Sequence, residues 1–366
     1  MIMNNKGTLP SQELRKFIKQ NLIHSSLKEI NENQIQPSSL DLTITNKAFR
    51  VSGMFLPKKG EKISDILKKI TIYEQDLDKQ PILEKDVVYV IELNEELSLP
   101  QDIYGYCSSK SSTGRLNIQT KLICDNTDIF DKVEKGYKGK LYMLVISKSF
   151  LIGLTPGDSL NQITLHNGYS RLSDQELLQE HKKNSFSFDN EGNSLQLSLH
   201  HGILMSIDLG KKPICWRAKS NNEPLFLNKR QYNPSNYFEK VETLSDGFII
   251  LNEGEFYIFC TKEKISVPLE YSAEMVAFDS GIGEFRSHDA GFFDPGFGYG
   301  RGNIKGTSAV LEVRPYGNNI IIRDCQPICK MVFDRVTEIP DKAYGVELKS
   351  HYQQQEGPRL SKHFSQ

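Results

Sequence analysis

The sequence of 366 residues contains one tryptophan, six cysteines and no long apolar run. No segment reaches the ~18 consecutive apolar residues that a transmembrane helix requires. The N-terminal residues lack the apolar core of a secretory signal peptide. Because these features are missing, we expect a soluble, cytoplasmic protein without a membrane partner.

The sequence also lacks an excess of either charge, since 45 basic residues face 46 acidic ones. This balance argues against a surface that binds nucleic acid over the whole molecule. The cysteines are scattered, which is typical of a reducing compartment and not of a disulfide framework. Only Cys325 and Cys329 are close, and we expect both in a core strand because free cysteines are usually buried.

Most of the chain predicts short strands separated by turns, with few helices. Residues 11–21 and 56–72 carry apolar residues at helical spacing. The clearest predicted strands are 87–93, 103–107, 141–146, 160–165, 195–199, 203–209 and 308–313. The fold class is therefore mainly β, as a barrel or a sandwich.

An internal duplication divides the chain into two β domains. Residues 82–90 resemble residues 250–258, and residues 97–100 resemble residues 265–268, both with an offset of 168. Such a fixed offset indicates one supersecondary plan built twice. Residues 167–194 are polar and predict a helical or loose connector, so the expected division is 1–166, 167–194 and 195–366.

The first copy carries a motif suited to binding an anion. Cys107 to Arg115 contains hydroxyls, a glycine and two cations within nine residues. Small residues let backbone N–H groups approach a phosphate, while Lys110 and Arg115 would neutralise it. A polar serine-rich turn explains the motif about equally well, since this is no Walker sequence.

The second copy carries a turn and an acid instead. Asp294-Pro295-Gly296 predicts a tight turn, and Glu312 falls inside a predicted strand. Burial would raise the pKa of such a carboxyl group and suit it to proton transfer near neutral pH. The alternative is an outward-facing glutamate on a half-exposed strand. Neither copy holds both the cation-rich motif and the acid.

Together these motifs resemble the dCTP deaminases of the dUTPase-like superfamily. The resemblance rests on residues 36–42, on Ser111 to Arg115, on Asp294 to Phe297, on Leu311-Glu312 and on the tail from Tyr352 to Ser361. It implies two tandem, distorted, jelly-roll-like β-barrels of the dUTPase type. It also implies hydrolytic conversion of dCTP to dUTP and ammonia in deoxynucleotide synthesis.

The resemblance assigns roles to eight residues. Glu312 would be the general base and acid, and Ser111 and Arg115 would position the water and the tetrahedral centre. The remaining residues would bind substrate: Lys110 and Ser112 at the phosphates, Asp294 at the sugar, Tyr352 and Gln355 in a closing tail. The family usually has arginine at position 110, and lysine cannot form the same bidentate contact.

The resemblance also sets expectations for cofactors and partners. Mg²⁺ would arrive with the triphosphate, and no zinc is expected, because the H-x-E and P-C-x-x-C motifs of zinc deaminases are absent. The expected partners are dCTP and dUTP, dTTP as a candidate feedback inhibitor, and further copies of the chain in a homo-oligomer. Because the motifs are split between copies, we expect Arg115 and Glu312 to meet across a domain or chain interface.

Three questions stay open from the sequence. A dUTP diphosphatase, or a combined deaminase and diphosphatase, shares the same barrel and phosphate motif. A nucleotide sensor would bind dCTP or dTTP without turnover. The glutamine-rich tail has few apolar residues, so we expect burial alone not to hold it in place without nucleotide.

Overall fold

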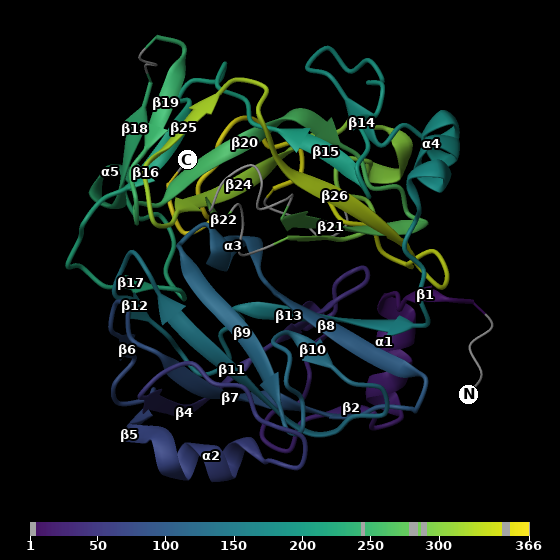
Figure 1. The fold of residues 1–366 in the computed structure, drawn as a ribbon. Coiled ribbons are helices and arrows are strands. Elements are labelled where there is room, and N and C mark those ends of the chain that lie inside the picture. Colours follow the sequence, from purple (N-terminus) through teal and green to yellow (C-terminus); the bar gives the residue numbers. More distant parts are fainter. Residues whose placement is uncertain (1–4, 243–245, 278–284, 287–290, 346–351, 366) are drawn as a thin grey trace.

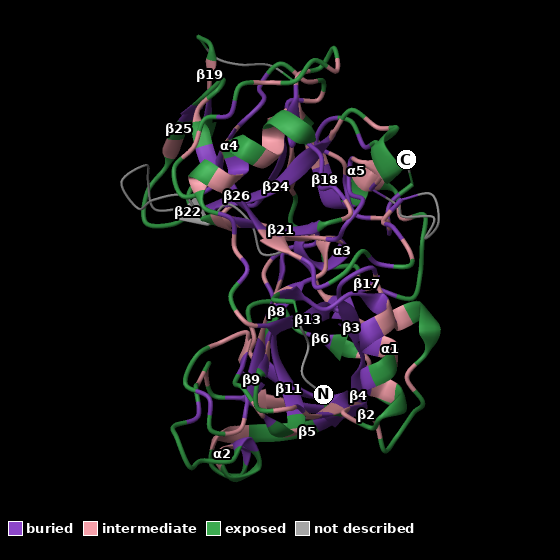
Figure 2. Ribbon diagram, turned by 90° about the vertical axis from the view of Figure 1, so that its right-hand side faces the viewer, coloured by how far each residue is buried: buried purple, intermediate pink, exposed green. Residues whose placement is uncertain are grey.

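The computed structural model of the chain describes residues 5–242, 246–277, 285–286, 291–345 and 352–365. Within these ranges the protein is mainly β, as expected, and forms two stacked units (Figure 1). Buried residues follow the strands of both units, while exposed residues gather on loops and outer helix faces (Figure 2).

The first unit contains two larger sheets and three short helices. One sheet has the order β1-β13-β8-β10 with β3 beside β13, and the other has the order β5-β4-β7-β11-β9 with β2 beside β7. The helices are α1 (Ser11–Lys19), α2 (Ile63–Ile70) and α3 (Ser111–Gly114), with a 3₁₀ turn η1 (Glu32–Gln34). The strands are β1 (Gly7–Thr8), β2 (Ile23–His24), β3 (Leu40–Leu42), β4 (Ile44–Val51), β5 (Thr71–Asp76), β6 (Ile82–Leu83), β7 (Tyr89–Ser98), β8 (Ile103–Ser109), β9 (Ile118–Cys124), β10 (Lys132–Val133), β11 (Lys138–Ser147), β12 (Ile152–Gly153) and β13 (Asn161–Asn167).

The second unit repeats this plan. Its sheets have the orders β18-β16-β20-β24-β22, with β14 beside β20, and β15-β26-β21-β23. It also contains α4 (Asp174–Lys183), α5 (Pro234–Tyr237) and η3 (Gly300–Gly302). The strands are β14 (Ser187–Phe188), β15 (Ile203–Ser206), β16 (Cys215–Ala218), β17 (Leu225–Phe226), β18 (Phe238–Val241), β19 (Phe248–Leu251), β20 (Tyr257–Ile265), β21 (Tyr271–Ala277), β22 (Phe285–Arg286), β23 (Phe292–Phe293), β24 (Thr307–Pro315), β25 (Ile320–Arg323) and β26 (Pro327–Arg335).

Strand pairing supports the duplication residue by residue. Val145 of β11 pairs with Tyr89 of β7, and Val313 of β24 pairs with Tyr257 of β20. Both members of the second pair follow those of the first by the offset seen in the sequence. Because side chains alternate strictly along a strand, a conserved register keeps the same faces buried in both units.

The polar segment expected as a connector belongs to the second unit. A capping box formed by Ser173 and Glu176 starts α4, and Ser187 of β14 pairs with Ile265 of β20. In the first unit α1 is followed by β2, whose Ile23 pairs with Leu97 of β7. Residues 173–188 therefore repeat the first unit's α1 and β2.

Two local expectations were wrong. Residues 195–199 form no strand but only an isolated bridge between Leu199 and Ile203. Their alternating apolar side chains face the protein on one side, but the backbone pairs with no neighbouring strand along its length. Cys329 is buried in β26 as expected, whereas Cys325 is exposed in the turn before it, at a φ of 60°. All six cysteines are free.

The two units pack directly against each other at the joint between them. Strand β17 of the second unit pairs in parallel with β12 of the first. Leu360 and Phe364 from the C-terminal end pack into the same apolar cluster as the first unit's core. Of the helices that the structure describes, none is long and apolar enough to cross a membrane.

Candidate active site between the two units

A polar pocket of about 310 Å³ lies where the two units and the C-terminal end meet. We call it the interdomain pocket, and residues 352–365 the tail. All eight residues singled out in the sequence line this pocket: Lys110, Ser111, Ser112, Arg115, Asp294, Glu312, Tyr352 and Gln355. Its two halves come from one chain, with α3 on one side and β24 on the other.

Glu312 is a buried acid and not the exposed residue of the alternative interpretation. Its side chain is 4% exposed, on a β24 strand whose residues are all buried. The ladder places it opposite Ile258, where the first unit has Leu144 opposite Val90. At this register the first unit has a buried leucine and the second unit has a carboxylate.

The Glu312 carboxylate lies directly against the backbone of Gly114. A β-carbon added at Gly114 would overlap both carboxylate oxygens and lie 2.6 Å from the carboxyl carbon. Carbon atoms cannot approach so closely, so only glycine leaves room for this contact. Arg115 follows Gly114 in sequence. Burial lowers the pKa of its guanidinium, and the neighbouring Tyr352 and Glu312 oppose part of that lowering.

Arg115 is held by the tail. Its Nη1 donates to the carbonyl oxygen of Arg359 at 2.9 Å, and its Nη2 donates to Oε1 of Gln355 at 3.0 Å. The guanidinium also lies 3.8 Å from the centroid of the Tyr352 ring, a cation–π distance. The buried Nε of Arg115 has no hydrogen-bond partner in the described residues, so it is an unsatisfied donor at this site.

Asp294 is buried in the turn that the sequence predicts. Gly296, two residues later, has a φ of 98°, which only glycine adopts easily. Oδ1 of Asp294 accepts from the backbone N–H of Ser38 at 2.8 Å, and the Ser38 and Ser39 hydroxyls approach the same carboxyl group. Burial raises the pKa of Asp294 to about 7.

Three contributors to the pocket had no role assigned from the sequence. The first is Asp41, which forms an ion pair with Lys110. Its Oδ1 is buried without a hydrogen-bond partner in the described chain. Lys362 of the tail also lines the pocket, and burial and the Lys110 charge lower its pKa to about 8. Ser38 orients Asp294. Ser38 and Asp41 lie within residues 36–42, one of the motifs that carried the resemblance. That motif could have identified both residues as candidates from the sequence.

The tail is buried, which differs from the expectation drawn from its composition. The Ser361 hydroxyl donates to the Ser112 carbonyl at 2.8 Å, and Nε2 of Gln355 donates to the Ser308 carbonyl at 2.7 Å. Leu360 and Phe364 add apolar burial against the first unit. Its few apolar side chains are therefore placed where they are buried.

The rest of the pocket is apolar on one side and balanced in charge. Aromatic side chains from the second unit face it: Phe292, Phe293, Phe297 and Tyr344. Three cations, Lys110, Arg115 and Lys362, accompany three carboxylates, Asp41, Asp294 and Glu312. Among the residues that the structure describes, no group of three or more His, Cys, Asp or Glu side chains could hold a metal ion.

These features define a class of protein: a duplicated β-barrel with one buried acid–arginine pocket at the joint. The N-terminal domain model of 2'-deoxycytidine 5'-triphosphate deaminase matches residues 5–169, and the C-terminal domain model matches residues 173–364. The chain belongs to the dCTP deaminase family, a family of hydrolytic deaminases, as the resemblance implied.

Individual relatives agree with this family. A crystal structure of 2'-deoxycytidine 5'-triphosphate deaminase from Agrobacterium tumefaciens is 34% identical, with a TM-score of 0.86 over 92% of this chain and 100% of that one. A "dCTP deaminase, dUMP-forming" from Halobacterium salinarum is 30% identical over 145 residues, 38% of this chain and 70% of that protein. A "dCTP deaminase" from Ignicoccus hospitalis is 25% identical over 162 residues, 43% of this chain and 78% of that protein.

Proposed function

We propose that this protein hydrolyses dCTP to dUTP and ammonia in the interdomain pocket. The observation that carries the proposal is the Glu312 carboxylate, buried against Gly114 and beside Arg115. One acid in a closed, polar pocket can take a proton from water and return it to the substrate. Family membership and the Agrobacterium structure support the same substrate.

The proton movements balance with Glu312 alone. Glu312 removes a proton from water as the oxygen attacks C4 of cytosine, and it delivers that proton to N3. A second proton passes from the new hydroxyl to the amino group, which leaves as ammonia. Arg115 would stabilise the charge that develops on the attacking oxygen, since its Nε is unpaired and a buried site strengthens such contacts.

The other pocket residues would position the substrate. Ser111 would orient the water beside Arg115, and Ser112 and Lys110 would hold phosphates with Lys362. Lys110 would exchange its ion pair with Asp41 for a phosphate oxygen. Asp294 would accept the sugar hydroxyl, and Tyr352 and Gln355 would hold Arg115 while the tail excludes water.

We expect the triphosphate to enter this pocket together with an added cation. The lining cations and carboxylates cancel formally, so a triphosphate would bring uncompensated negative charge. Mg²⁺ bound to the phosphates would reduce that charge, and it prefers oxygen ligands and retained water over a protein cage. Lys110 and Lys362 would then meet the phosphate oxygens that remain.

A second candidate is a combined deaminase and diphosphatase. The name of the Halobacterium relative, dUMP-forming, favours this possibility. Incubation with dCTP and Mg²⁺ separates the candidates, because dUTP plus ammonia indicates deamination alone, and dUMP plus pyrophosphate indicates both steps. Binding of dCTP without any product would indicate the sensor.

Glu312→Gln is the matching test of mechanism. Glutamine keeps the shape of the side chain but cannot accept the proton, so kcat should fall by about 100-fold or more. Binding of dCTP, measured by calorimetry, should persist. Wild-type turnover in this variant would overturn the assignment.

The proposal also includes a cytoplasmic location and assembly into a homo-oligomer. The free cysteines and the soluble substrate suit the cytoplasm. A homo-oligomer with dTTP as a candidate inhibitor agrees with what the resemblance implies. Light scattering and inhibition by dTTP test these two parts separately.

A further inference from the structure

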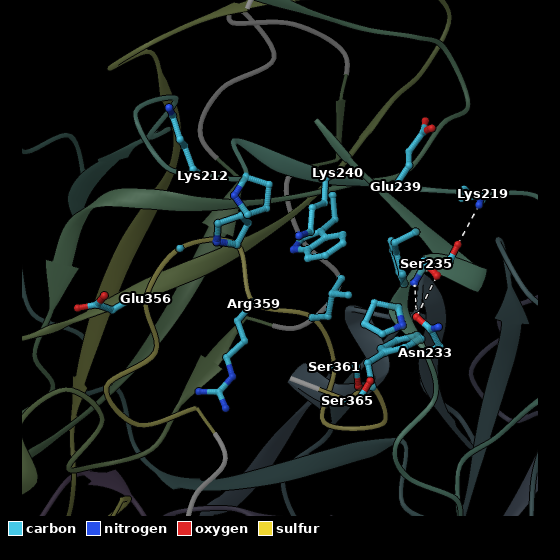
Figure 3. Close-up of a pocket in the computed structure, with 18 residues that line it drawn as sticks. Lys212, Lys219, Asn233, Ser235, Glu239, Lys240, Glu356, Arg359, Ser361 and Ser365 are labelled. Carbon is cyan, nitrogen blue, oxygen red and sulfur yellow. Dashed lines mark hydrogen bonds between the residues drawn. The ribbon is translucent and has the colours of Figure 1, made fainter. Parts of the chain in front are cut away.

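A second, larger cavity of about 910 Å³ lies on the other side of the tail. We call it the tail cavity. One wall comes from β16, α5 and β18, and the other comes from residues 356–361, 364 and 365 of the tail. Figure 3 shows Lys219, Asn233 and Ser235 on one side, with Glu356 and Arg359 of the tail on the other.

The cavity combines an apolar lining with a basic rim. Its apolar lining includes Trp216, whose partly exposed side chain could stack on a flat ring, together with the partly exposed Pro213 and the buried Pro358 and Phe238. Trp216 pairs across the strands with Lys240, whose Nζ lies 5.6 Å from the indole centroid. A ring placed on Trp216 would therefore have a cation within reach of its substituent.

The charges around the rim favour an anion. Four cations accompany two carboxylates, a formal excess of two positive charges: Lys212, Lys219, Lys240 and Arg359 against Glu239 and Glu356. Glu239 already forms an ion pair with Arg217, which reduces its pull on the cavity. Aromatic lining with surplus lysines matches a planar base that carries phosphates.

The tail forms the partition between this cavity and the interdomain pocket. On one side the Arg359 carbonyl binds Arg115 and the Ser361 hydroxyl binds the Ser112 carbonyl. On the other side residues 356–361 line the tail cavity. Beyond them, the His363 carbonyl accepts from the N–H of Tyr232, and the Phe364 ring packs on Phe238 at 5.4 Å.

We propose that the tail cavity binds a nucleoside phosphate as an effector, with its base on Trp216 and its phosphates at the lysine rim. The occupant contacts residues 356–361 from behind and favours the tail position that closes the interdomain pocket. A ligand shifts such an equilibrium only if it binds one tail position better, and this cavity exists only while the tail forms its wall. The regulatory half of the proposal rests on the proposed deamination, whereas the binding half does not.

Binding can be measured directly, because Trp216 is the one tryptophan of the sequence and lies in this cavity. We expect dATP to change its fluorescence in a saturable way. Adenosine, which lacks the anion, and inorganic triphosphate, which lacks the ring, should each bind at least about tenfold more weakly, as loss of one charge-assisted or stacking contribution implies. No saturable change with dATP would overturn the proposal.

Two charge reversals locate the signal. Lys240→Glu and Lys212→Glu, both exposed on the rim, should weaken dATP binding by roughly tenfold or more. Lys59→Glu, an exposed lysine of the first unit outside the cavity, is the matched control and should bind as the wild type does. Equal binding by all four proteins would place dATP elsewhere and overturn the site. If the tryptophan fluorescence instead changes with protein concentration in the absence of dATP, a second copy of the chain occupies the cavity. That result would also overturn the proposed site.

Turnover tests the coupling. In the wild type, dATP should lower the KM for dCTP by about fivefold, within the usual range of allosteric coupling, and Lys240→Glu should abolish this effect. Deamination without any dATP effect, despite binding at Trp216, would overturn the coupling alone. Saturable binding at Trp216 in a protein that deaminates nothing would leave the site standing and refute the proposed function.

Discussion

At the scale of single residues, Gly114 and Glu312 form one unit although 198 positions separate them in the chain. Glycine in this short helix is not required by its backbone, because its φ is not positive. It is required by the carboxylate that occupies the space of its missing side chain. The first unit supplies the room and the second unit supplies the acid.

Gly114→Ala should therefore separate activity from stability. The added methyl group must displace the flexible end of Glu312, so kcat should fall by about 100-fold or more. Alanine is a better helix former than glycine, so the free energy of unfolding should change by no more than about 1 kcal/mol. Gly53→Ala is the control, because a β-carbon there meets no atom within 4 Å. Full activity in Gly114→Ala would contradict the close contact.

Asp294 should make stability depend on pH in a predictable direction. Its folded pKa is about 7, against an ordinary value of 3.8, and burial is the cause. Between these values the unfolded chain loses the proton while the folded protein keeps it. The stability that this group contributes is thus fully present below the unfolded pKa and declines as pH rises through about 7.

Asp294→Asn removes this dependence, because asparagine keeps an oxygen that can accept from the Ser38 N–H but cannot ionise. Relative to the wild type, its melting temperature should rise steadily as pH increases from about 4 to about 8. Melting curves over this range provide the measurement. Parallel profiles for the two proteins would show that Asp294 has an ordinary pKa. Binding of dCTP should weaken at every pH if Asp294 meets the sugar.

At the scale of elements, the tail shows where composition misleads. Its glutamine-rich sequence predicts weak burial, yet Phe364 is 3% exposed and packs on Tyr237 and Phe238. Removal of residues 350–366 would therefore open the first unit's core, because Leu360 and Phe364 belong to its apolar cluster. Composition averages over a segment, whereas stability depends on where its few apolar side chains are buried.

Phe364→Ala should accordingly destabilise the whole protein. Removal of a buried phenylalanine ring costs about 3–5 kcal/mol, which should appear as a lower denaturant midpoint. The KM for dCTP should also rise, because the tail that holds Arg115 loses its anchor. Tyr169→Ala, at a ring that is 75% exposed, is the control and should change stability by about 0.5 kcal/mol or less. Equal effects of the two substitutions would contradict the packing of the tail.

At the scale of the whole molecule, the duplication could be predicted because paired strands preserve their register. Strand β21 begins and ends at the same sequence offset from β8 that the repeated motifs show. Because this offset is constant, short apolar motifs could be aligned from the sequence alone. The start of the second unit could not be found in this way. α4 and β14 repeat α1 and β2, but their polar sequence has diverged and their offset has shifted.

The pocket was predictable to the extent that its residues lie in local motifs. All eight candidates line it, whereas Lys362 had no role and the Asp41–Lys110 ion pair was missed. Such a pair joins residues far apart in sequence, and no local pattern encodes it. The sequence likewise left open whether Arg115 and Glu312 meet within a chain or between chains, because packing of two units is set by their whole surfaces.

The structure makes a decisive test of that question possible. Glu312 contacts Gly114 of its own chain, so each chain should carry a complete site even if copies associate. Arg115→Ala and Glu312→Gln should each be inactive, and mixing them with subunit exchange should restore nothing, since every site keeps one damaged half. The double variant mixed with wild type should retain only the wild-type share of activity. Recovery of activity in the first mixture, up to about a quarter of wild type for random pairing of halves between chains, would require the site to be built across a chain interface.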